Sequence, residues 1–428
     1  MAILLRCPDV ETLRALVHAS PAYHAAYRKV RNQALFKALC AEYYGMESVD
    51  AVVALRSRGL YADIPSNKGK IYTLLDQWQR HKEIRRLNEP SADEPADLDE
   101  IIRLIRLHKI MKFCLVDFCN AVHRPVWINS EQWNNDVLPI SLSRTEKTRL
   151  LRALYRVQIY ANIFGHRVFY PGEKTPIQWR YNSWEEETFE TREVWRLFMS
   201  PMAPWEFQEY GCVWQYIYER YRQPYQEVAD YFDQFEMMPM ERVEYKYQID
   251  PLPTNCSLLD TDEVRGNTDI HMSNLATMGP VFFHKFIRDP CFLHRRDMIV
   301  VNTRFTPFTF DEVSHDLHFE DMHPLRYPGF KSPDDFRRTK GLWKTLSPIH
   351  RPNIACARLW FKKLSEDWLI YSMGYEGEEF WKWGYAIWDD ARLIEWKKQL
   401  SLPFSTPYTT EPGRRPSEDY LIYERLPS

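Results

Sequence analysis

The chain has 428 residues, of which 45% are hydrophobic and 27% charged, a composition typical of a folded protein of two to three domains. Its 56 Lys and Arg nearly balance its 59 Asp and Glu, so the net charge of −3 argues against nucleic acid or an anionic membrane as a partner. Only 14 glycines and no long apolar run are present, which disfavours phosphate-binding glycine loops and membrane-spanning helices.

The eight cysteines are scattered along the chain and form no C-x-x-C pair. The first residues, MAILLRCPDV, lack the long apolar segment of a secretory signal. We therefore expect reduced thiols and a location in the cytoplasm or nucleus.

Segment 1–45 has the sequence signals of short helices. Asp9 can cap a first helix, and Ser20 followed by Pro21 begins a second. A third helical run follows near residues 33–44. One face of the first helix is apolar, at Val10, Leu13 and Val17.

Segment 46–96 predicts two weaker connecting helices followed by a linker. Residues 88–97, NEPSADEPAD, are polar, acidic and rich in proline. We expect a domain boundary at this linker.

Segment 97–235 predicts the helical core. Residues 98–119 are apolar on nearly every side, which is typical of a buried helix. Ser143 and Glu146 form a capping box, and Gly165 ends the helix that follows. Leucines and other apolar residues of this helix fall on more than one face, so it should contact neighbours on two sides. Residues 205–222 predict another amphipathic helix.

Segment 236–428 is interrupted by prolines too often for long helices. Residues 298–303, MIVVNT, predict a short strand, and residues 386–399 a last helix. We therefore predict a mainly α fold: N-terminal helices, a helical core, and a less regular, Pro-rich C-terminal third packed on that core.

Two groups of polar residues are candidates for a metal site or a catalytic site. His, Asp and Glu crowd the stretch SHDLHFEDMH, and its imidazoles are His315, His318 and His323. Such ligands can hold zinc or iron, although their spacing matches no established motif and an ordinary polar loop is the simpler interpretation. The acids of WDDARLIEW are interpreted as a helix start and its solvent face. We expect no catalysis, no cofactor and no bound metal.

Four stretches spread from end to end are TLRALVHASPAYHAAY (12–27), LLRALYRVQIYANIFG (150–165), SPMAPWEFQEYGCVWQYI (200–217) and GYAIWDDARLIEW (384–396). They resemble a group of filamentous-fungal proteins described as F-box-like, and residues 8–39 resemble the middle and end of an F-box. A full F-box opens with a Leu-Pro element and a first helix. Only residues 1–7 precede Pro8, so we expect a shortened opening helix.

This resemblance implies that the N-terminal helices contact the Skp-type adaptor of a cullin ubiquitin ligase, and that the rest of the chain holds an unidentified protein substrate. The contact residues that it implies are Leu5, Pro8, Leu13, Leu16, Val17 and Tyr23. The leading hypothesis is therefore a non-catalytic, F-box-like substrate adaptor. The alternatives are a helical scaffold or regulatory protein of the same family without ligase coupling and, more remotely, a metal-dependent enzyme.

Overall fold

The structure is a computed structural model that describes residues 2–43, 48–86, 97–170, 188–236, 268–302, 313, 346–356 and 380–398. Every regular element within these residues is helical, which confirms the mainly α fold. The three histidines of the predicted metal site, the Pro-rich stretch 403–417 and nearly all of the acidic linker lie outside the described residues. No helix of the described part is long and apolar enough to cross a membrane.

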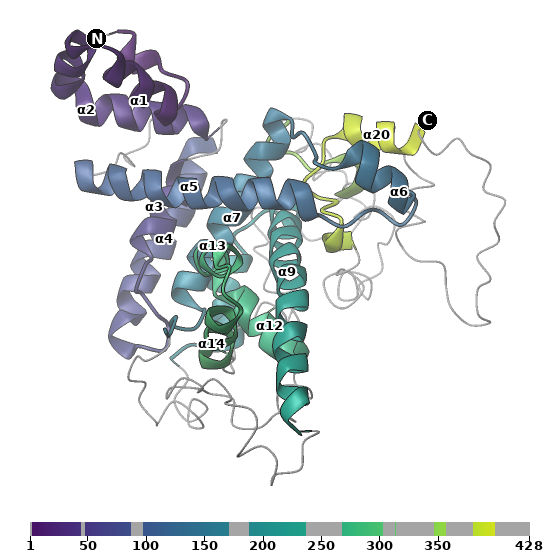
Figure 1. The fold of residues 1–428 in the computed structure, drawn as a ribbon. Coiled ribbons are helices and arrows are strands. Elements are labelled where there is room, and N and C mark those ends of the chain that lie inside the picture. Colours follow the sequence, from purple (N-terminus) through teal and green to yellow (C-terminus); the bar gives the residue numbers. More distant parts are fainter. Residues whose placement is uncertain are drawn as a thin grey trace, which may run out of the picture.

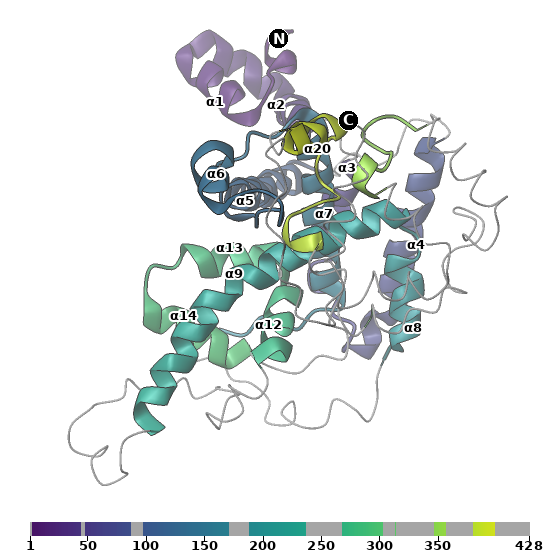
Figure 2. The ribbon, with the colours of Figure 1, turned by 90° about the vertical axis from the view of Figure 1, so that its right-hand side faces the viewer.

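The N-terminal residues form a helical hairpin. A single 3-10 turn, Leu4–Arg6, precedes α1 (Val10–Ala19), and α2 (Pro21–Glu42) returns against it. The third helical run predicted near 33–44 is the second half of α2, which continues through a kink at Val30. In both views the hairpin stands at one end of the molecule, outside the main body (Figures 1 and 2).

Two helices follow the hairpin, as predicted for the connecting segment. They are α3 (Ser48–Arg56) and α4 (Lys68–Arg86). The apolar side chains of both helices, with Trp78 fully buried, join the main hydrophobic core. Both helices therefore belong to the body of the molecule.

Helix α5 (Leu98–Ala121) crosses the molecule beneath the hairpin (Figure 1). The Asp97 side chain caps it by accepting a hydrogen bond from the Glu100 amide at 2.8 Å. The prediction that this helix is buried on every side is wrong, because Val116 is 57% exposed. One stripe, which includes Leu104, Met111 and Phe118, is buried in the core, Ile105 and Phe113 are half-buried beside it, and the outer side is exposed.

Helix α7 (Arg144–Ile163) is the centre of the body, and contacts α3, α5, α9 and α13. The capping box predicted at its start is present: Ser143 Oγ accepts from the Glu146 amide at 3.1 Å, and Glu146 Oε2 accepts from the Ser143 amide at 2.8 Å. Burial extends around the whole helix, which confirms contacts on two sides. A short helix, α6 (Ser130–Gln132), and a π-helical turn, Trp133–Val137, lie between α5 and α7.

Helix α9 (Pro204–Glu236) packs along α7 and is longer than the predicted 205–222 because it continues through Pro224. Gly211 lies inside it because a Cβ there would come within 2.4 Å of the Trp381 indole ring. The helix buries polar as well as apolar side chains, since Gln215 is inside the core. A short helix, α8 (Thr191–Val194), and a π-helical turn, Trp195–Met199, precede α9.

The described parts of the C-terminal third belong to the same core and include four helices. They are α12 (Thr268–Thr277), α13 (Gly279–Arg288), α14 (Phe292–Asn302) and α20 (Asp390–Lys398). The predicted strand at 298–303 is wrong, because residues up to Asn302 are helical. α14 buries Met298, Ile299, Val300 and Val301 together, and this packing outweighs their preference for strands. The predicted last helix begins four residues late, at Asp390.

Candidate functional site

The hairpin is the first candidate site, because the resemblance places the partner contacts there. Asp9 caps α1 by accepting from the Thr12 amide at 2.6 Å, and Ser20 caps α2 by accepting from the Ala22 amide at 3.2 Å. These local bonds satisfy amides that a helix start leaves without partners. The two helices then enclose a small apolar cluster made of Leu4, Cys7, Leu13, Val17, Ala34 and Ala38.

The structure divides the six predicted contact residues between interior and surface. Leu13 and Val17 are only 1% and 7% exposed, so they hold α1 against α2 and present almost no surface to a partner. Leu5 and Leu16 are half-buried at the edge of the same cluster. The remaining two lie outside it, with Tyr23 half-buried and Pro8 exposed. The predicted partner contact therefore depends on four of the six residues, and remains a prediction.

Glu42, in the last turn of α2, connects the hairpin to the body. Its carboxylate accepts hydrogen bonds from the Val10 amide at 2.9 Å and from Lys112 Nζ of α5 at 2.8 Å. His108 Nε2, also on α5, lies 3.3 Å from the same carboxylate, and His108 Nδ1 lies 2.9 Å from the Tyr155 hydroxyl of α7. One buried carboxylate thus joins α1, α2 and α5.

These contacts also set the charge of Glu42. Burial by itself would raise its pKa, but the bonds from His108, Lys112 and the Val10 amide outweigh burial and lower the pKa to about 2. Glu42 is therefore ionised at neutral pH, as a partner for Lys112 must be. A groove of about 250 Å³, lined by Val10, Leu39, Ile105 and neighbouring residues, opens beside this joint.

A second cluster of charged residues is buried between α7 and α9. Arg152 donates two hydrogen bonds to Glu209, at 2.6 and 2.9 Å, and both side chains are buried. Arg156 lies 3.1 Å from Glu206 and 3.5 Å from Asp50 of α3. The pKa of Arg152 would be lowered by burial but is raised by Glu209 and Glu206, so the guanidinium remains charged.

Arg149 extends this cluster to the C-terminal part of the chain. Its guanidinium donates to the Ile387, Trp388 and Pro348 carbonyls at 3.0–3.1 Å and lies 3.2 Å from Asp389. Glu146 acts in the same way, accepting from Arg392 of α20 at 2.6 Å. The cluster therefore joins α3, α7, α9 and the segment before α20.

This cluster was not among the sites predicted from the sequence. The available signal was the spacing of Arg149, Arg152 and Arg156, which puts three cations on one side of a helix whose other faces are apolar. The matching acids, Glu206 and Glu209, are one turn apart on α9. In the structure these side chains hold elements together.

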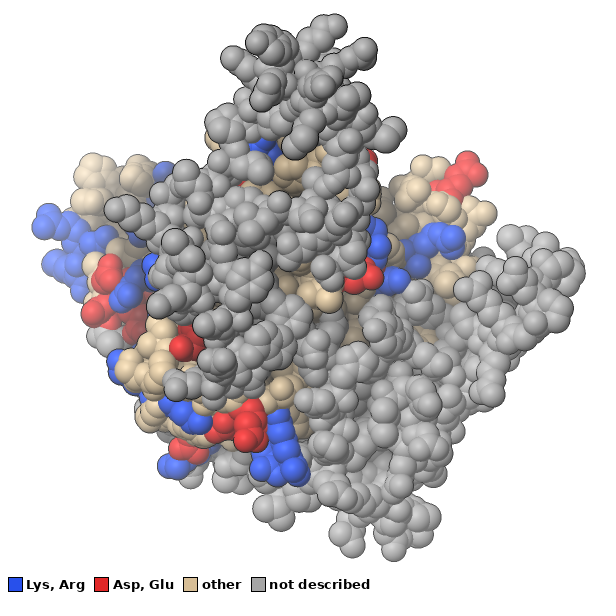
Figure 3. All heavy atoms as spheres, turned by 90° about the horizontal axis from the view of Figure 1, so that it is seen from below, with Lys and Arg blue, Asp and Glu red and all other residues tan. Residues whose placement is uncertain are grey.

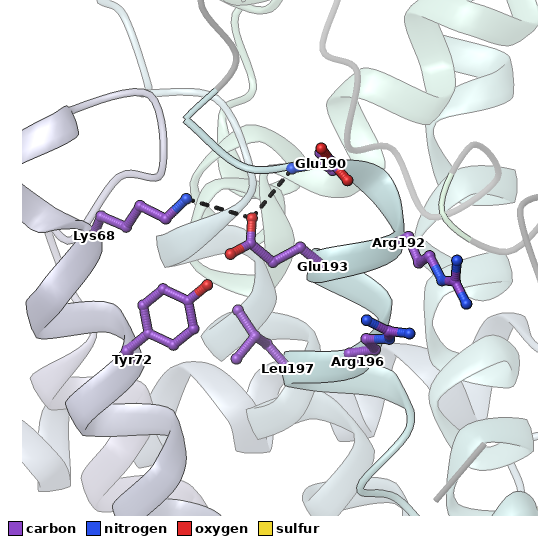
Figure 4. Close-up of a pocket in the computed structure, with 7 residues that line it drawn as sticks. All are labelled: Lys68, Tyr72, Glu190, Arg192, Glu193, Arg196 and Leu197. Carbon is purple, nitrogen blue, oxygen red and sulfur yellow. Dashed lines mark hydrogen bonds and ion pairs between the residues drawn. The ribbon is translucent and has the colours of Figure 1, made fainter. Parts of the chain in front are cut away.

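A groove of about 540 Å³ separates the start of α4 from α8 (Figure 4). Lys68 Nζ on one wall donates to the Thr188 carbonyl at 2.6 Å and lies 3.5 Å from Glu193 on the other. Arg192 and Arg196 line the far side (Figure 4). Cations and carboxylates alternate here, as they do among the described residues of the lower surface (Figure 3). The Lys68–Glu193 bridge holds the two walls together.

The acids of WDDARLIEW, considered in the sequence as a possible carboxylate site, have structural roles. Asp389 accepts from the Ser143 hydroxyl, and Asp390, the first residue of α20, accepts from the Ile354 amide at 2.6 Å. Glu395 is on the exposed side of α20. These acids are the helix start and solvent face that the sequence predicts. Within the described residues, no group of three or more His, Cys, Asp or Glu is arranged to hold a metal ion.

No family model, curated protein or solved structure matches this chain. The function must therefore be argued from the hairpin, its joint with the body, and the surfaces of the described residues.

Proposed function

We propose that this chain is a non-catalytic interaction protein, an F-box-like adaptor whose N-terminal hairpin binds the Skp-type adaptor of a cullin ubiquitin ligase in the cytoplasm or nucleus. The main support is the form of the hairpin. It has its own apolar cluster, separate from the main core, and it stands out from the body where a partner can approach it (Figure 1).

The larger body has the role of holding a protein substrate in this proposal. Its core is continuous from α3 to α20, and aromatic side chains supply much of it. Such a rigid body can fix the position of a substrate relative to a ligase only if the hairpin itself is held firmly. The Glu42 joint provides that attachment, through the Val10 amide and Lys112.

The first experiment is co-purification of the full chain with the Skp-type adaptor of its host. Leu16→Asp and Tyr23→Asp each place a charge in the half-buried surface that the proposal uses. Each should weaken adaptor binding by about tenfold or more, since interface aromatic and apolar anchors carry most of the binding energy. Ala15→Asp and Ala22→Asp are matched controls at exposed neighbouring positions, and should bind normally.

Point variants are better than deletion of the hairpin, because Leu39 and Tyr43 at the end of α2 belong to the main core. Hydrogen exchange of the α1 and α2 amides will show that each variant keeps the hairpin folded. Tyr23 lies outside the hairpin cluster, so Tyr23→Asp tests the contact even if Leu16→Asp loosens the hairpin. If the wild-type chain is folded but does not bind the adaptor, the proposed coupling to a ligase is wrong.

The second candidate is a helical scaffold or regulatory protein without ligase coupling. The burial of Leu13 and Val17 favours it, because two of the six implied contacts serve the interior of the hairpin. The same co-purification distinguishes the two candidates. The metal-dependent enzyme is the remote alternative, and elemental analysis of the purified chain tests it.

A further inference from the structure

The hairpin has an unusual charge distribution. Between Glu11 and Glu42 the sequence has no Asp or Glu, but five cations: Arg14, Arg28, Lys29, Arg31 and Lys37. The whole chain has a net charge of −3, so the remainder carries −8. Positive charge is therefore concentrated on the part of the molecule that stands away from the body (Figure 1).

Four of these cations, Arg28, Lys29, Arg31 and Lys37, are spread around α2 and do not follow a single helix face; together we call them the α2 basic surface. All four are exposed, and none makes an ion pair within the described part of the chain. Some cations on other helices do have acidic partners, since Arg80 pairs with Asp76 at 2.7 Å and Arg103 with Asp99 at 3.0 Å, whereas others, such as Lys70 and Arg106, are exposed without one among the described residues. The lack of acids along α2 is thus a property of this surface.

Three of the four cations surround the kink. Arg28, Lys29 and Arg31 lie within two residues of Val30, whose backbone (φ −128°, ψ 21°) is not helical. Like charges so close on one helix repel each other and destabilise it. No carboxylate of the described residues relieves that repulsion, but a carboxylate-rich partner would.

We propose that the α2 basic surface is a docking site for an acidic protein surface. Charge complementarity selects this partner. A compact acidic patch can match the hairpin alone, whereas a long polyanion such as nucleic acid, or an extended anionic membrane, would also meet the net negative charge of the body. Tyr27, the aromatic residue beside Arg28, packs against the hairpin cluster and does not form an open platform for stacking bases.

This inference goes beyond the proposed function, because it concerns the cations of the hairpin, none of which is among the implied adaptor contacts, and does not require a ligase. The Skp-type adaptor is one protein that could present the acidic patch. The experiment below uses a generic acidic probe, so its result is independent of whether that adaptor binds.

The probe is a labelled oligoglutamate peptide, and the readout is its fluorescence anisotropy with the full chain. Arg28→Glu with Arg31→Glu should weaken binding about tenfold, because two attractions become two repulsions. Arg28→Gln with Arg31→Gln should give a smaller loss of binding. This variant replaces Arg28→Glu with Arg31→Glu if that protein folds poorly. Added salt should weaken wild-type binding and leave little difference between the variants.

The matched control is Arg58→Glu with Lys70→Glu, which changes the charge equally at two exposed cations of the body. This control should bind the peptide as the wild type does. An equal loss in the control, or no binding by the wild type, would overturn the proposal. Tighter binding to a duplex DNA of equal charge, or to phosphatidylserine vesicles, than to the peptide would show that the partner is not a protein.

Discussion

The hairpin and the α7–α9 layer are both pairs of packed helices, but their charged side chains lie in opposite environments. In α7 and α9, arginines and glutamates are buried and paired, as Arg152 and Glu209 are. On α2, arginines are exposed and unpaired within the described residues. An unpaired charge is costly in the interior but nearly free in water. The charged side chains of α7 and α9 therefore find their partners inside the fold, whereas the cations of α2 remain available to another molecule.

The largest expected effect is that of Val157→Asp in α7. Val157 is buried between neighbours on both sides, and an unpaired carboxylate there should cost about 5 kcal/mol, enough to unfold the body. Circular dichroism and solubility of the purified chain measure this result.

Leu13→Asp in the hairpin is the control for Val157→Asp, because it should unfold the hairpin and leave the body folded. Leu13 is just as buried, but its cluster is small and separate from the main core. Hydrogen exchange should speed up in α1 and α2 and stay slow in α7 and α9. Global unfolding by Leu13→Asp would show that the two regions are one cooperative unit.

The next effect tests the buried pair. Arg152→Ala leaves Glu209 buried without its bidentate partner and should destabilise the chain by about 4 kcal/mol. Arg152→Met combined with Glu209→Leu removes both charges and should recover about half of that loss or more. Urea unfolding of the three proteins measures both values. A double variant less stable than Arg152→Ala would mean that the pair contributes more than an apolar replacement.

The smallest of these effects is at the Glu42 joint and depends on pH. The pKa of Glu42 is lowered from 4.5 to about 2 in the folded chain, so ionised Glu42 stabilises the fold above pH 4.5, and this contribution is lost as the pH falls through about 2. Glu42→Gln should cost about 2 kcal/mol at neutral pH, and the difference from wild type should disappear toward pH 2. Urea unfolding at a series of pH values checks this. A difference in the free energy of unfolding that stays the same at every pH would mean that Glu42 stabilises the fold through its packing and not through its charge.

Local signals in the sequence predicted much of the framework. Asp9, Ser20 and the Ser143–Glu146 capping box each start a helix where the sequence indicates one. These signals worked because a cap bonds to amides within three residues of itself, so no distant part of the chain is needed.

Local signals were not sufficient where a distant part of the chain decides the outcome. Gly211 fits within α9 because Trp381, far along the chain, occupies the space of a side chain. Residues up to Asn302 are helical and not a strand because α14 packs against α9 and α12. The burial of Leu13 and Val17 against α2 also depends on tertiary packing, and their contact with a partner remains a prediction.

The sequence by itself determined that this chain is helical, where its main helices begin, and that residues 12–41 carry only positive charge. Capping and composition are local properties that any fold of this chain retains. Tertiary structure alone decided which charges are buried and paired, and which are exposed. That choice depends on bringing together residues such as Arg152 and Glu209, which are 57 positions apart, and only the packed structure brings them into contact.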